Sequence, residues 1–93
     1  SLEQNYPNPF NPTTTINYSI PQRSSVILTL FDVLGRKVST IVNKEQPQGN
    51  YEVEFDGKDF TSGIYFYRLQ SGDFVETKKI ADDAGLDNTE FNE

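Results

Sequence analysis

The stretch Gly63–Ile64–Tyr65–Phe66–Tyr67–Arg68–Leu69 decides the fold. It is rich in β-branched and aromatic residues, and Ser71–Gly72–Asp73 and then Phe74–Ile80 follow it directly. This pattern predicts a strand paired with its successor through a glycine-containing turn. Because strand side chains alternate with period two, Tyr65, Tyr67 and Leu69 share one face, and Ile64, Phe66 and Arg68 share the other. Both faces are largely apolar, so we predict that this strand lies inside its sheet.

Other short apolar runs lie between clusters of Gly, Pro, Asn and Ser, and no helical periodicity of useful length occurs. We predict strands at Thr13–Ile20, Val26–Asp32, Lys37–Val42 and Tyr51–Asp56. Thr29 is expected to point outward. The residues expected to point inward are Ile16, Tyr18, Ile20, Val26, Leu28, Leu30, Tyr51, Val53 and Phe55. The fold class predicted from these residues is an all-β, antiparallel β-sandwich.

The connections also carry local signals. Val33–Leu34–Gly35–Arg36 is predicted to reverse the chain, since Gly35 takes a positive φ at no steric cost. The broken alternation of Lys37–Val42 predicts a bulge or a sheet edge. Asn43–Asn50 reads as a polar loop. Thr77–Lys78–Lys79 makes the final strand polar, which predicts an exposed edge where lysine discourages sheet-to-sheet pairing.

Two aromatic features allow two interpretations each. Gly63–Ile64–Tyr65 is similar to the tyrosine corner of immunoglobulin-like domains, although three aromatics filling a core explain it equally well. The proline-rich segment 5–12 is expected to be extended. Either Tyr6 and Phe10 close one end of the sandwich while the asparagines satisfy backbone groups, or the segment is a docking surface for another protein.

The charge of the chain is uneven. The net charge of −6 comes mainly from residues 81–93, which carry five acids and no base, whereas residues 1–80 balance to −1. We therefore predict one domain over residues 1–80 and a mobile acidic tail over residues 81–93, either native or added to the natural chain. There is no basic patch interleaved with aromatics, which argues against nucleic acid as a partner. No stretch is long and apolar enough to predict a membrane span.

Catalysis is not expected. The chain has no histidine and no cysteine, and it has no glycine-rich loop between a strand and a helix to hold phosphate. Glu52, Glu54 and Asp56 alternate along one strand face, which predicts a solvated surface rather than a calcium site or a carboxylate pair across a cleft. We predict no catalytic residue, no metal site and no cofactor.

Three separated segments together resemble the type A C-terminal sorting domain of type IX secretion substrates. The first is Leu2–Pro12 with Thr14–Ile16, the second runs from Val26 through Leu34–Gly35–Arg36, and the third is Ser62–Leu69 leading to Thr77–Lys79. The resemblance implies an immunoglobulin-like antiparallel sandwich of about seven strands, related to the immunoglobulin-like domain of flagellar hook-cap proteins. It also implies a non-catalytic signal module at the end of a larger exported protein.

The same resemblance implies partners and a location. The module would follow an upstream cargo domain through the periplasm and outer membrane, be recognised by the secretion translocon, and be removed by a sortase-like peptidase, which leaves the cargo secreted or on the cell surface. The residues that it implies for partner recognition are Asn8, Pro9, Phe10, Asn11, Pro12, Gly35, Arg36, Thr77, Lys78, Lys79 and Ile80. The family usually ends soon after the terminal strand, whereas this chain continues to Glu93.

Two other functions remain open at this point. A carbohydrate-binding or scaffolding accessory module of an extracellular enzyme would need exposed aromatics, for which Tyr6, Phe10, Phe31, Phe60 and Phe66 are the candidates. An adhesin domain with an internal isopeptide bond would need a lysine on an inward strand face, and we expect none there.

Overall fold

The computed structural model describes residues 1–6, 13–57 and 63–82, and side chains up to Ile80. Six strands make up most of this part of the chain. They are β1 (Thr13–Ile20), β2 (Ser24–Asp32), β3 (Lys37–Gln46), β4 (Gly49–Asp56), β5 (Gly63–Ser71) and β6 (Phe74–Asp82). The all-β prediction is confirmed, and β6 continues to Asp82.

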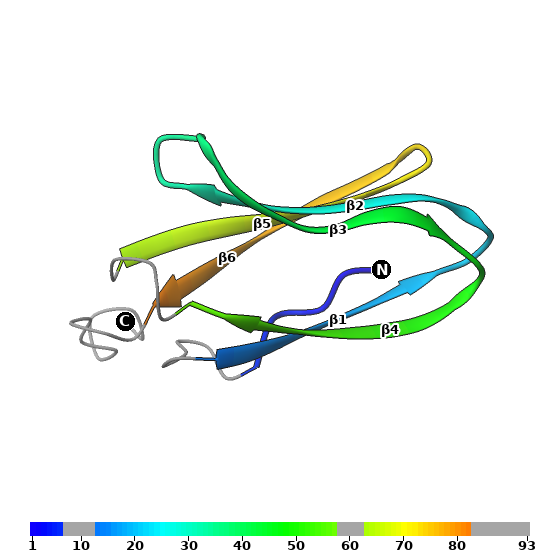
Figure 1. The fold of residues 1–93 in the computed structure, drawn as a ribbon, viewed down its shortest axis with the longest axis horizontal. Coiled ribbons are helices and arrows are strands. Elements are labelled where there is room, and N and C mark those ends of the chain that lie inside the picture. The colour runs from blue at the N-terminus through cyan, green and yellow to red at the C-terminus, as the bar shows by residue number, and fades with distance from the viewer. Residues whose placement is uncertain (7–12, 58–62, 83–93) are drawn as a thin grey trace.

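The strands form two antiparallel sheets packed face to face. One sheet has the order β3-β2-β5-β6, and the other consists of β1 and β4. Figure 1 shows the four-stranded sheet lying over the β1–β4 pair, with the N-terminal segment running beside β1. That segment joins β1 through bridges between Leu2 and Tyr18 and between Tyr6 and Thr15. It therefore widens the smaller sheet and covers one side of β1.

The alternation read from the sequence matches the buried faces. β5 lies between β2 and β6, as predicted, with Tyr67 and Leu69 fully buried. The core between the sheets also takes residues from every other strand and from the N-terminal segment. Its buried members are Leu2, Ile16, Tyr18, Ile20, Val26, Leu28, Leu30, Val42, Phe55, Tyr65, Tyr67, Leu69 and Ile80. Since burial removes apolar surface from water, these residues supply the main stabilisation of the sandwich.

The third strand is irregular and lies at an edge, as predicted. Its register with β2 shifts between Leu28 and Thr29 and again between Leu30 and Phe31. The predicted polar loop Asn43–Asn50 is wrong, because β3 continues to Gln46 and β4 begins at Gly49. Pairing with β2 holds this polar stretch in the sheet. Gln46 is buried there and accepts a hydrogen bond from the Tyr18 hydroxyl at 2.8 Å.

The outward direction predicted for Thr29 is confirmed, whereas the first of the two interpretations of Tyr6 is wrong. Thr29 lies on the outer side of β2 but is only 3% exposed, because it sits between Thr40 of β3 and Arg68 of β5 in the middle of the sheet. Tyr6 does not close an end of the sandwich, since it is 79% exposed. Asn5 is the buried neighbour instead. Phe10, its predicted companion, lies outside the described residues.

Candidate recognition surface

Strand β6 forms one edge of the larger sheet, and β5 is the one described strand that pairs with it. Ile80 is 1% exposed and anchors the strand in the core. By alternation, Lys78 and Glu76 share the inward face with Ile80, whereas Thr77 and Lys79 point outward and are exposed. The predicted recognition residues of this strand therefore divide between two faces. An exposed strand edge offers backbone groups and outward side chains to a partner.

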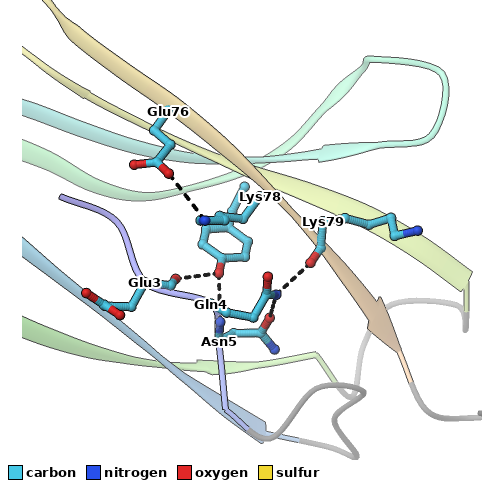
Figure 2. A network of polar contacts seen from close by, with 7 residues as sticks. Glu3, Gln4, Asn5, Glu76, Lys78 and Lys79 are labelled. Carbon is cyan, nitrogen blue, oxygen red and sulfur yellow. Dashed lines mark hydrogen bonds and ion pairs between the residues drawn. The ribbon is translucent and has the colours of Figure 1, made fainter. Parts of the chain in front are cut away.

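Lys78 contradicts the expectation that no lysine lies on an inward strand face. Its ammonium pairs with the Glu76 carboxylate at 3.3 Å, and the two side chains are 31% and 35% exposed. In Figure 2 the Lys78 side chain points toward Glu76, whereas the Lys79 side chain points away from the network. The two adjacent lysines look equivalent in the sequence. Because Ile80 is buried and side chains alternate along a strand, Lys78 faces inward and Lys79 faces outward.

The hydroxyl of Tyr67 ties the N-terminal segment to β5. It accepts a hydrogen bond from the backbone N–H of Asn5 at 2.7 Å and donates one to the backbone carbonyl of Glu3 at 2.7 Å. Burial disfavours the charged phenolate and raises the pKa of Tyr67 to about 12. This contact spans more than 60 residues, whereas the hydroxyl of a tyrosine corner bonds to the backbone a few residues upstream, so the tyrosine corner at Tyr65 stays a prediction.

Gln4 connects this N-terminal segment to the edge strand. Its side-chain amide donates to the Asn5 side-chain oxygen at 2.8 Å and to the backbone carbonyl of Lys79 at 2.8 Å (Figure 2). The Asn5 amide in turn donates to the Thr14 hydroxyl at 2.9 Å. Segments from the two ends of the described chain thus form one polar network. Local sequence patterns carry no signal for it, because its partners are up to 75 residues apart.

The hairpin between β2 and β3 is built around Asp32. One carboxylate oxygen accepts from the backbone N–H groups of Leu34 and Arg36, each at 2.9 Å, and the other accepts from the Arg36 guanidinium at 2.8 Å. These bonds, led by the Arg36 backbone N–H, lower the pKa of Asp32. Gly35 has a φ of +83°, which confirms the predicted turn. The role of Asp32 was missed, although an aspartate at a turn start is a usual signal.

The structure brings some of the predicted recognition residues together. Gly35 of the hairpin and Thr77 of β6 line the same surface pocket, with a volume of about 260 Å³. Arg36 is exposed beside it, bound to Asp32. Asn8, Pro9, Phe10, Asn11 and Pro12 lie outside the described residues. The surface thus consists of the outward face of β6, the neighbouring hairpin and the N-terminal segment bound to β6.

Other types of site have less support in this part of the chain. Glu52, Glu54 and Asp56 are exposed, and across residues 1–6, 13–57 and 63–82 no group of three or more acidic side chains is placed to hold a metal ion. Within the same residues there is no helix of the length and apolarity needed to cross a bilayer. Of the carbohydrate-binding candidates, Phe31 and Phe66 are half-buried, and Phe60 lies outside the described residues.

The two antiparallel sheets and their shared core define a small all-β sandwich. The family described as the secretion system C-terminal sorting domain matches residues 4–81. The chain therefore belongs to this family, and its function is that of a C-terminal sorting signal for the type IX secretion system. It matches no curated protein and no solved structure.

Membership of the family also gives the location. Proteins that carry this domain are exported across the outer membrane and are secreted or held at the cell surface. The domain works with the secretion system and with an upstream cargo domain, and the family is in general non-catalytic. The match does not favour the carbohydrate-binding alternative. The seven-stranded immunoglobulin-like arrangement remains a prediction.

Proposed function

We propose that the secretion translocon recognises this domain through the outward face of β6, and that the domain itself performs no catalysis. The observation that supports this most strongly is the division of β6. Ile80 fixes the strand to the core, while Thr77 and Lys79 face solvent on a sheet edge. An edge of this kind offers main-chain groups for affinity and alternate side chains for specificity.

The contact between Gln4 and the Lys79 carbonyl supports a role for the N-terminal segment in positioning that edge. Recognition then depends on the folded domain and not on the terminal strand as a free peptide. In the proposed sequence of events, an upstream cargo domain precedes Ser1, which is exposed beside Ser19. A sortase-like peptidase separates the cargo from the module after export.

The test is export of a reporter fused ahead of Ser1, in a host with an active type IX system. Lys79→Ala should lower the exported fraction several-fold and leave the melting temperature of the purified domain unchanged, since an exposed surface substitution typically changes stability by less than about 0.5 kcal/mol. The matched control is Lys44→Ala, which removes an exposed lysine from β3, the opposite edge of the same sheet.

Lys78→Ala separates recognition from stability. It removes the partner of the half-buried Glu76 carboxylate, so its main effect should be a lower free energy of unfolding. Equal export of the Lys79→Ala and Lys44→Ala fusions would reject recognition through the outward face of β6. If both variants lose export equally, the cause is the loss of positive charge in general, and this result would also reject recognition through the outward face of β6.

A further inference from the structure

A pocket of about 260 Å³ lies on the outer face of the four-stranded sheet, away from the core between the sheets. It is bounded by β2 and β5, by the hairpin after β2, and by the outward side of β6. Its lining residues are Phe31, Asp32, Val33, Gly35, Phe66, Arg68 and Thr77. These residues come from three separate segments of the sequence, 31–35, 66–68 and 77, so the pocket exists only in the folded sheet.

Arg68 is the charged group of this pocket that has no acidic partner within residues 1–6, 13–57 and 63–82. Its guanidinium carbon lies 4.5 Å from the centre of the Phe31 ring, which fixes the orientation of the cation. Its Nε is shielded from solvent and has no hydrogen-bond partner. None of the three ion pairs among the described residues includes Arg68. A partly desolvated cation with an unsatisfied donor gains strongly from an arriving anion.

The neighbouring charges leave this attraction in place. Asp32 also lines the pocket, but its carboxylate already binds the Arg36 guanidinium and two backbone N–H groups. Lys79 is exposed on the same outward face of β6 as Thr77, and it pairs in register with Phe66 of β5. Among the described residues that line the pocket, Arg68 is thus the charged side chain that takes part in none of these ion pairs.

The walls and rim of the pocket are apolar. Phe31 and Phe66 form part of the lining, and at the adjoining hairpin Val33 and Leu34 are 66% and 73% exposed. A single guanidinium between apolar walls suits a carboxylate carried on a hydrocarbon chain, because the planar fork of arginine matches a carboxylate. A phosphate, with more charge to neutralise, is usually bound by a cluster of donors.

From this geometry we propose that the pocket is the docking site for an acidic segment of a partner protein, in which an aspartate or glutamate lies next to an apolar residue. The carboxylate pairs with Arg68, and the apolar residue packs on Phe66 and the exposed hairpin. This inference rests on the proposed recognition through β6, since Thr77 belongs to both surfaces. It names the chemistry of the partner and adds Arg68, which the sequence did not single out.

The first test measures binding to the 93-residue chain by NMR titration. The probe is the peptide acetyl-Leu-Glu-Leu-amide, and its control is acetyl-Leu-Gln-Leu-amide. The glutamate peptide should give saturable shifts of the backbone amides of residues 31, 66, 68 and 77. The glutamine peptide should bind about tenfold more weakly, because charge-assisted hydrogen bonds are roughly twice as strong as neutral ones. Absence of saturable shifts, or equal affinity for both peptides, would overturn the proposal.

Matched variants then assign the binding to Arg68. Arg68→Gln should abolish the shifts, and Arg68→Lys should retain weaker binding, since it keeps the charge and loses the planar fork. The control is Arg23→Gln, because Arg23 is an exposed arginine paired with Glu45 away from this pocket. Should Arg68→Gln fail to fold, the Arg68→Lys result still decides the matter. Unchanged affinity in Arg68→Lys would exclude the forked pairing.

The reporter assay distinguishes this inference from the proposed function. Arg68→Gln should lower export, whereas Arg23→Gln should not. If Lys79→Ala impairs export but the wild-type chain does not bind the glutamate peptide, the pocket proposal fails and recognition through β6 stands. Normal export of the Arg68→Gln fusion would exclude a role for the pocket in docking, even if the peptide binds.

Discussion

Replacement of Tyr67 by phenylalanine tests the link between the N-terminal segment and the larger sheet. The hydroxyl holds the Asn5 N–H and the Glu3 carbonyl at 2.7 Å each, and Asn5 is only 2% exposed. Leaving a buried donor unsatisfied costs about 1–3 kcal/mol, so we expect a loss of about 2 kcal/mol in the free energy of unfolding. For a domain of this size, that corresponds to a fall on the order of 10 °C in melting temperature.

Urea and thermal denaturation of the wild type and the variant measure this loss. Tyr51→Phe is the matched control, because the Tyr51 hydroxyl bonds to the Pro47 carbonyl at an exposed site where water can replace it. Its ring keeps the stacking on Tyr18, whose centroid lies 5.4 Å away. If Tyr67→Phe is no less stable than Tyr51→Phe, the hydroxyl does not hold the segment in solution.

The same variant has a pH dependence of known sign. The pKa of Tyr67 is raised from 10.0 to about 12 in the folded protein because burial disfavours the phenolate. Between these values the unfolded chain releases the phenolic proton and the folded chain keeps it, so the stability of the wild type falls as the pH rises. Tyr67→Phe lacks this contribution, and the stability gap between the two proteins should narrow from pH 10 to pH 12. A constant gap would show that the hydroxyl is not desolvated.

Two further changes test the hairpin after β2. Gly35→Ala should lower the free energy of unfolding, measured by urea denaturation, by about 1–2 kcal/mol. The cost comes from backbone conformation alone, because φ is +83° and an added Cβ meets nothing within 4 Å. Gly35→Asn should cost less, since asparagine tolerates this region of φ, and equal costs for the two variants would contradict this explanation. Asp32→Asn should lower the stability at pH 7. The pKa of Asp32 in the folded state lies below its ordinary value of 3.8. The difference in stability between wild type and Asp32→Asn should therefore shrink as the pH falls below 3.8 and the carboxylate is protonated. A stability difference that does not change with pH would exclude a contribution from the charge.

Short-range patterns determined much of this fold. The alternation in Gly63–Leu69 was enough to predict a central strand, because each side chain of a strand alternates strictly from one face to the other. The lysines of Phe74–Ile80 predicted an edge, and Gly35 predicted the hairpin. The expected loop at Asn43–Asn50 was wrong, since a polar composition cannot show that a neighbouring strand holds the backbone in a sheet.

The sequence by itself therefore predicted the six strands apart from their exact ends, most of their buried faces and, through resemblance, the sorting family. Only the tertiary structure decided that Lys78 turns inward to Glu76, that Tyr67 binds the backbone of residues 3 and 5, and that Arg68 lies on Phe31, with no acidic partner in the part of the chain that the structure describes. The physical reason is distance along the chain. Alternation acts between adjacent residues, whereas sheet order and register bring together groups up to 75 residues apart.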